Sequence, residues 1–283
     1  MRTANERPMM SADTVAKQGR PTALFIGHPG HELRVFGWTS LVHPKVYVLT
    51  DGSGSTGTPR LERSAKLLSD VGAGSGTLFG RFSDHEIYQA MMALEFTRFT
   101  AMVDELAEVW IRNGIEVVAS DASEGYSATH DLCCEMAQAA TELIRIQTGR
   151  RIERVTFCLT EWEGHHVAER PTNSLRIRLS DEVLDQKIAA AKSYVELSAE
   201  VDRALTLKGK DYFREEYLTP ASGWSIKEAT YKPSYEVYGE LRVAEGKFAS
   251  VLRYGEHVLP ILRALREHVT LSDASGASSS GNI

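Results

Sequence analysis

The sequence predicts an α/β protein with a mostly parallel sheet flanked by helices. Three observations support this class: short apolar runs of strand length recur along the chain, segments with helical spacing alternate with them, and polar loops follow the runs. Strands and helices that alternate in this way form βαβ units with right-handed crossovers. The result is a Rossmann-like arrangement, in which the active site is expected at the carboxyl edge of the sheet.

The individual elements follow from periodicity and from turn residues at their ends. The predicted strands are Thr22–Ile26, Lys45–Thr50, Gly76–Phe79, Glu116–Ser120 and Val155–Thr160. The predicted helices are His31–Ser40, Arg60–Val71, Glu86–Arg112, His130–Gln147 and Asp181–Ala204, with a final helix over Lys247–Val269 interrupted near Pro260. The aromatic, turn-rich segment from Lys208 to Arg242 receives no assignment.

One domain of residues 21–271 is expected, with a C-terminal helical extension and disordered tails at 1–20 and 272–283, because both ends are polar or rich in small residues. The net charge of -6 argues against a nucleic-acid partner. No apolar stretch approaches the roughly 18 residues of a membrane span, and no secretory signal is recognisable. We therefore expect a cytoplasmic protein. A homo-oligomer stays open as an alternative to a monomer.

The three cysteines form neither a disulfide framework nor a zinc-binding CxxC pair. Cys133 and Cys134 lie within a helical pattern, so we expect them to pack in the interior.

The first apolar run ends in His28-Pro29-Gly30-His31-Glu32. His28 and His31 are three residues apart, so a helical turn would bring their rings together. His130 precedes a helix at the same predicted edge. Three imidazoles would form a zinc site with an open position, as catalytic zinc sites have. The alternatives are a solvated histidine pair in the loop and a plain helix N-terminus at His130, where Asp131 favours the dipole.

Acidic residues occupy two further loops at this edge. Asp51 follows the second strand within a glycine-rich turn, and Glu161 and Glu163 follow the fifth strand beside His165 and His166. The glycine-rich turn lacks both the P-loop lysine and the GxGxxG spacing, so nucleotide binding is not favoured. The histidine pair could be solvated or could belong to the site. His43 and His85 have no comparable neighbours and are expected on the surface.

Several short motifs follow one another along the chain between Thr22 and Leu218. They are Gly27–Glu32 after the first strand, Leu-Thr-Asp-Gly at 49–52, Arg60 twelve residues ahead of Gly72, Gly125–Asp131 before a helix, Leu184–Ala190 with its lysine, and Phe213–Tyr217. In this order and spacing the chain resembles the LmbE-like (PIG-L) zinc-dependent N-deacetylases. The resemblance implies the α/β fold, a zinc ion (Zn2+) and the hydrolysis of an N-acyl group.

The chain departs from the family's Ala-His-Pro-Asp-Asp-Glu motif at two positions. The family's general base is replaced by Gly30 and its second metal ligand by His31, while Ser127 replaces a histidine that often assists. The resemblance therefore implies His28 and His130 as ligands, with His31 as a sensible substitute. It supplies no base, and losing a positioned base typically costs about 10²–10⁴ in rate.

The function expected from these residues is removal of an N-acyl, most simply N-acetyl, group from a sugar or amino-sugar conjugate. The candidate bases are Glu163, Glu32 and Asp51, with Glu161 as a fourth. The resemblance places Arg60, Asp84 and Tyr126 where the family holds substrate hydroxyls. One alternative is an LmbE-like binding protein without catalysis, which Gly30 and Ser127 favour. The other is a metal-free nucleotide-binding protein, against which the missing fingerprint argues.

Overall fold

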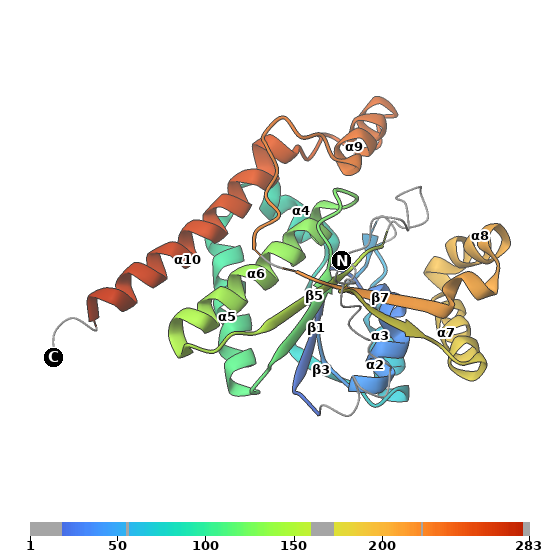
Figure 1. Cartoon of the computed structure of the whole chain (residues 1–283). Helices are drawn as coiled ribbons and strands as arrows, with labels where there is room; N and C mark the ends of the chain where they lie inside the picture. Colours follow the sequence, from blue (N-terminus) through green and yellow to red (C-terminus); the bar gives the residue numbers. More distant parts are fainter. Residues whose placement is uncertain (1–18, 55–56, 160–172, 222, 280–283) are drawn as a thin grey trace, which may run out of the picture.

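The computed structural model describes residues 19–54, 57–159, 173–221 and 223–279. Its strands form one sheet in the order β3-β2-β1-β4-β5-β7-β6 (Figure 1). β1 to β5 pair in parallel, whereas β7 runs antiparallel to β5 and β6 antiparallel to β7. The strands are β1 Thr22–Ile26, β2 Lys45–Thr50, β3 Gly74–Phe82, β4 Val117–Asp121, β5 Glu153–Phe157, β6 Leu175–Arg178 and β7 Glu215–Pro220. The predicted α/β class with a mostly parallel sheet is confirmed.

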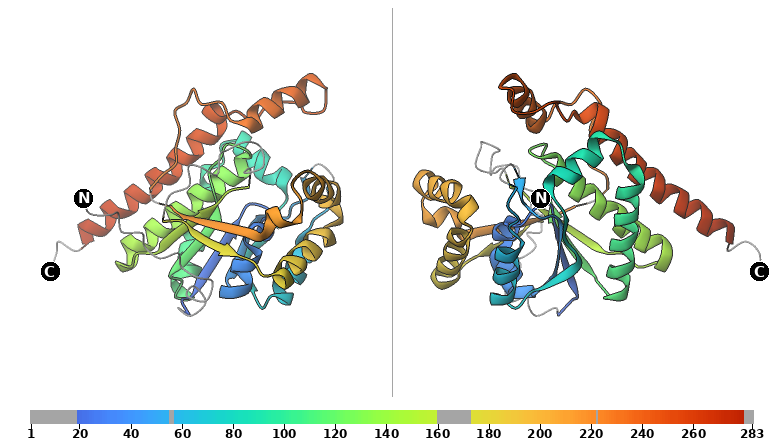
Figure 2. Two further views of the ribbon diagram at one scale, coloured as in Figure 1. Left: turned by 45° about the vertical axis from the view of Figure 1, so that its right-hand side comes forward. Right: turned by 180° about the vertical axis from the view of Figure 1, so that it is seen from behind.

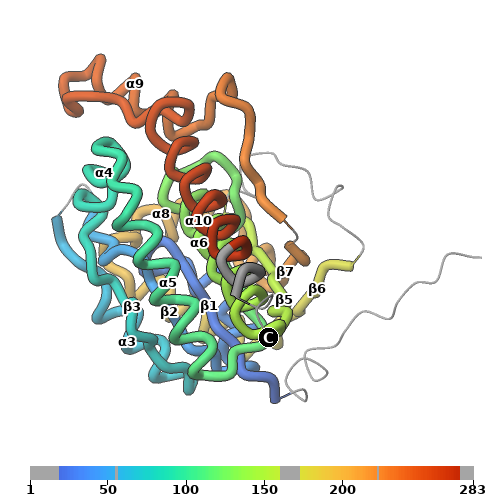
Figure 3. Tube along the Cα trace, turned by 90° about the vertical axis from the view of Figure 1, so that its left-hand side faces the viewer, coloured from blue at the N-terminus to red at the C-terminus, as the bar shows by residue number. Residues whose placement is uncertain are grey.

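Helices cover both faces of the sheet (Figures 1 and 2). α5 (Phe96–Arg112), α6 (Ala128–Thr148) and α10 (Leu259–Ser279) cover one face, and in Figure 3 α10 lies along α6. The other face carries a 3-10 turn, η1 (His31–Val35), followed by α2 (Phe36–Val42), α3 (Leu61–Asp70) and α7 (Asp181–Ser193). The remaining elements are α4 (Asp84–Met92), η4 (Val195–Leu197), α8 (Ser198–Lys208), η5 (Lys210–Arg214), α9 (Ser234–Ala244) and the π-helical turn η6 (Tyr254–Val258). Each face of the sheet therefore has its own apolar core. None of the described helices is long and apolar enough to span a membrane.

Three predicted helices differ from the observed ones. The segment predicted as Glu86–Arg112 is two helices, α4 and α5, because Leu94 between them adopts a positive φ of 54° that no α-helix accommodates. The first predicted helix begins as the 3-10 turn η1, and the one predicted over Asp181–Ala204 divides into α7, η4 and α8.

Further differences lie towards the C-terminus. β6 and β7 were not predicted, because each carries charged residues next to its apolar ones. The final helix was predicted over Lys247–Val269 with an interruption near Pro260. The observed helix α10 starts at Leu259, so Pro260 lies in its first turn, where proline is tolerated. α10 then continues to Ser279, into the segment expected to be a tail.

Cys133 and Cys134 are buried and Cys158 is exposed. The expected packing role of the adjacent pair is confirmed, since Cys133 belongs to the core between the sheet and α6. His43 and His85 are exposed, as predicted.

A buried ion pair joins the two later motifs of the sequence. Lys187 on α7 lies 2.8 Å from Glu216 on β7, measured from Nζ to Oε1. The same carboxylate accepts hydrogen bonds from the backbone N–H groups of Gly37 and Trp38, at 2.9 and 3.0 Å. Because these groups belong to the first turn of α2, Glu216 supplies the negative charge that a helix N-terminus favours. The pair thus connects α2, α7 and β7 behind the loop that carries His31.

Replacing Glu216 with alanine is expected to destabilise the protein by about 3–5 kcal/mol, since it leaves a buried lysine without its partner. The neighbouring change Glu215→Ala removes ion pairs to the largely solvated Arg176 and Arg178, so a loss of about 1 kcal/mol or less is expected. Urea unfolding with unchanged m-values would compare the two free energies. Equal losses in both variants would contradict the structural role of Glu216.

Candidate metal centre

The loop after β1 meets the ends of β4 and α6 at a very close approach. Gly27 donates its N–H to Oδ2 of Asp121 at 2.7 Å, and Asp121 is the last residue of β4. A Cβ atom at Gly27 would lie 3.1 Å from that oxygen and 3.3 Å from Cδ2 of His130. The absence of a side chain at this glycine therefore lets the first loop approach the start of α6. This is the point where the order of strands reverses between β1 and β4, which is the usual ligand site of such sheets.

His28, His31 and His130 form one cluster. One ligand atom from each residue lies within 4.8 Å of the others. The ring centroids are 5.2 Å apart for His28 and His31, 5.2 Å for His28 and His130, and 4.4 Å for His31 and His130. The three residues predicted from the sequence as metal ligands are thus brought together, and the cluster could hold a metal ion.

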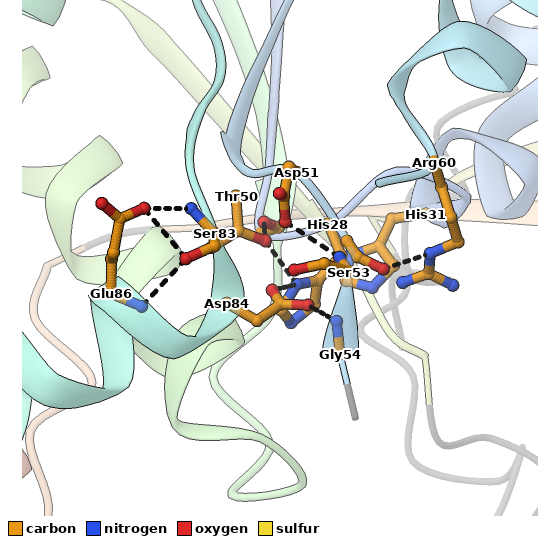
Figure 4. A network of polar contacts seen from close by, with 12 residues as sticks. His28, His31, Thr50, Asp51, Ser53, Gly54, Arg60, Ser83, Asp84 and Glu86 are labelled. Atoms are coloured by element: carbon orange, nitrogen blue, oxygen red, sulfur yellow. Dashed lines mark hydrogen bonds and ion pairs between the residues drawn. The ribbon is translucent and has the colours of Figure 1, made fainter. Parts of the chain in front are cut away.

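Carboxylates hold the outer nitrogens of two of these rings. Nδ1 of His28 lies 2.7 Å from Oγ1 of Thr50 and 2.7 Å from Oδ1 of Asp84 (Figure 4). Nδ1 of His31 lies 2.9 Å from Oδ2 of Asp121. Since each contact occupies Nδ1, the Nε2 atoms stay available for a metal. Ligand histidines typically show this pattern, with a carboxylate fixing the ring and its tautomer.

His130 provides the observation that tests whether a metal fits. Its side chain is 4% exposed, and its Nδ1 has no hydrogen-bond partner among the described residues. A buried polar atom without a partner is costly. A metal held by the three imidazoles would use nitrogen lone pairs to which no protein group donates a hydrogen bond. Three imidazole nitrogens are a donor set that fits zinc.

Burial keeps the rings of His31 and His130 in the uncharged form that a metal requires. Loss of hydration lowers the pKa of His31 and of His130 well below the usual value, and mutual repulsion with neighbouring histidines lowers both further. Burial raises the pKa of Asp121, against the opposing effects of His130 and of the Gly27 N–H. At neutral pH these two imidazoles are therefore uncharged, and metal binding would displace no proton from them.

The change Asp121→Asn is expected to weaken metal binding by roughly 10–100-fold, because it removes the charged partner of His31 while keeping the size of the side chain. The matched control is Asp104→Asn, which removes a carboxylate that lies 2.7 Å from Nε2 of His268 on the surface. Competition with a chelator would give both zinc affinities. A wild-type affinity in Asp121→Asn would show that this carboxylate does not support the cluster.

Glu32 follows the cluster in sequence, but its side chain is fully occupied. Oε2 accepts the N–H of Gly30 at 2.8 Å, and Oε1 accepts hydrogen bonds from the hydroxyls of Ser64 and Tyr194. The residue is completely buried. These contacts connect the loop to α3 and to the end of α7.

Gly30 adopts a backbone conformation that suits glycine. Its φ is 106°, and a Cβ atom there would lie 3.0 Å from Cδ1 of Leu197. Its N–H is bound by Glu32. The loop is therefore built around the absence of a side chain at this position.

The other predicted site residues lie around the cluster or outside the described part of the chain. Asp51 directly follows β2, and its Oδ1 accepts the N–H of Ser53 at 2.9 Å (Figure 4). Arg60 precedes α3, and its Nε donates to the carbonyl of Gly52 at 2.7 Å. The ring of Tyr126 is 48% exposed and lies 5.9 Å from that of His130.

Asp84 contacts His28, as described above, and Oδ2 also accepts the N–H of Gly54. Glu161, Glu163, His165 and His166 lie outside the described residues.

Two residues of the centre were missed in the sequence. Asp121 and Thr50 end strands β4 and β2 and contact His31 and His28. Both are polar residues at the carboxyl end of a strand, so the rule that selected Asp51 would have found them.

Searches with models of protein families and among curated proteins found no match for the sequence. Among solved structures, the conserved protein TT1542 from Thermus thermophilus is 19% identical, with a TM-score of 0.45 over 76% of this chain and 100% of that one. A triple mutant of a deacetylase from the teicoplanin biosynthetic pathway is 12% identical, with a TM-score of 0.49 over 71% and 97%. The A40926 pseudoaglycone deacetylase Dbv21 is 17% identical, with a TM-score of 0.47 over 72% and 100%.

At these identities the likeness concerns the fold.

Proposed function

We propose that this protein is a zinc-dependent hydrolase that removes an N-acyl group from a sugar or amino-sugar conjugate. The cluster of His28, His31 and His130 supports the proposal most directly, because three ligand atoms converge there and carboxylates hold the rings of His28 and His31. When bound, zinc supplies a Lewis acid that polarises an amide carbonyl and makes water a stronger acid. The sequence motifs that resemble those of the N-deacetylases agree with this chemistry.

The protein residues would orient the ligands and bind the substrate. Asp84 and Asp121 fix the rings of His28 and His31 through Nδ1. Arg60 and Tyr126 border the cluster and carry guanidinium and phenol donors, which suit the hydroxyl groups of a sugar. We assign them to substrate binding, while Asp84 supports His28.

A carboxylate would accept the proton of the attacking water and return it to the leaving amine. We assign this role first to Glu163 and then to Asp51. Glu32 is assigned to positioning instead, since both of its oxygens already accept hydrogen bonds from Gly30, Ser64 and Tyr194.

A second function is favoured by one observation. Gly30 stands where the family has its base, and its positive φ disfavours any side chain there. An LmbE-like protein that binds metal and ligand without turnover would have this feature.

Elemental analysis combined with an amide-hydrolysis assay distinguishes the two functions. The hydrolase is expected to hold about one zinc per chain and to release amine from N-acetyl amino sugars. Release that stops on chelation and returns with zinc would support it. Zinc-loaded protein that releases no amine from a panel of N-acyl sugars would instead support the binding protein, and protein without metal would contradict both.

A further inference from the structure

A pocket of about 240 Å³ lies away from the histidine cluster. Its walls come from the second half of α6, from the start of β5, and from Ala221 and Gly223 after β7, and they include Gln138, Arg145 and Arg154. The histidines lie at the carboxyl edge of the sheet, whereas Arg154 is near the amino end of β5. At a rise of about 1.5 Å per residue, the α6 residues of the pocket are roughly 12–22 Å beyond His130. The pocket and the metal centre are separate sites.

Arg154 is a buried guanidinium that is only partly satisfied. It is 7% exposed, its Nη1 donates to the side chain of Gln138, and its Nη2 donates to the carbonyl of Cys134 at 3.2 Å. Its Nε is buried and has no hydrogen-bond partner in the described part of the chain. No carboxylate of that part forms an ion pair with it, and Glu135 attracts it only from a longer range. A buried charge in this condition is unfavourable unless an anion joins it.

The other charges of the pocket leave an excess of positive charge. Arg145 is neutralised by Glu142, with Nε and Oε2 2.7 Å apart. Arg151 is exposed and has no ion pair among the described residues. Two guanidinium groups, Arg151 and Arg154, therefore have no ion-pair partner among the described residues. The two positive charges together match the charge of about −1.5 to −2 on a phosphate group at neutral pH. The paired N–H groups of a guanidinium also match the geometry of phosphate oxygens.

We propose that this pocket binds a small phosphate-bearing molecule through Arg151 and Arg154. Its volume lies below the range of roughly 300–1,000 Å³ that holds drug-sized ligands, so the occupant is inorganic phosphate or a small phosphate ester. The side chain of Arg154 is already held by Gln138 and Cys134, so little ordering is needed on binding.

Isothermal titration with inorganic phosphate and with glucose 6-phosphate, each against sodium chloride at equal ionic strength, tests the proposal. Saturable binding of one ligand per chain is expected for at least one of the two. Arg151→Gln alters an exposed side chain and is expected to weaken binding about tenfold or more, as loss of a charged hydrogen bond does. Arg154→Gln, checked for folding by circular dichroism, is expected to abolish it.

Two controls make the result specific. Arg150→Gln removes the same charge next to the pocket, from a side chain that donates to the carbonyl of Ile115, and is expected to bind like the wild type. His130→Ala is also expected to keep phosphate binding. No binding by the wild type, equal weakening in Arg150→Gln and Arg151→Gln, or loss of binding in His130→Ala would each overturn the proposal.

Discussion

His130→Ala is expected to release most of the zinc from the protein and with it any hydrolytic activity. The ring of His130 is buried, uncharged and close to both other imidazoles, so its removal leaves two ligands where three converge. Loss of an outer partner alone typically weakens a metal site about 10–100-fold, and loss of a ligand itself is expected to exceed that range. Elemental analysis after dialysis against a weak chelator would measure the remaining zinc.

The control for this change is His268→Ala, which removes a histidine of α10 that pairs with Asp104 on the surface. It is expected to keep the full zinc content. Full retention of zinc in His130→Ala would rule out the ligand set of His28, His31 and His130.

Glu163→Gln is expected to lower turnover by about 10²–10⁴ while zinc stays bound, if Glu163 is the general base. The amide keeps the size of the side chain but cannot accept the proton of water. The acid limb of the pH–rate profile is expected to disappear with the carboxylate, which a purely structural role would not cause. Turnover and zinc content would be measured together at several pH values.

Asp51→Asn and Glu32→Gln serve as the comparison pair. Asp51→Asn is expected to reproduce the loss only if Asp51 holds the role instead. Glu32→Gln is expected to reduce stability, since Ser64, Tyr194 and Gly30 all donate to this carboxylate. If no variant loses more than about tenfold in turnover with zinc bound, general-base catalysis by these residues is wrong.

The parallel part of the fold could be predicted because its signals are local. The limits of β1 and β2 follow from uninterrupted apolar runs with turn residues after them, and the predicted bounds match the observed ones. β6 and β7 could not be predicted in this way, since their pairing connects Leu175 with Leu218 across an intervening helical region. The break between α4 and α5 depends on a left-handed Leu94, which no helical periodicity reveals.

In the candidate site, too, local signals could be predicted from the sequence and contacts between distant residues could not. His28, His31 and His130 could be predicted from the sequence, because metal-binding residue types stand at the ends of predicted strands and helices. The strand-end rule could have selected Asp121, but its contact with His31 could not be predicted, because it joins residues 90 positions apart. The fixed role of Glu32 likewise depends on Tyr194, which only the folded chain brings beside it.

The positive φ of Gly30 limits which side chains the loop after β1 can carry. A single Gly30→Asp exchange would place a side chain in a backbone region that glycine alone occupies easily, with its first carbon against Leu197. A protein engineer who wanted a carboxylate at this position would have to offset the strain of the positive φ and move the end of the Leu197 side chain by a few tenths of an ångström. The single exchange is therefore expected to lower the stability of the protein, so a loss of activity in Gly30→Asp would not by itself show what this loop does.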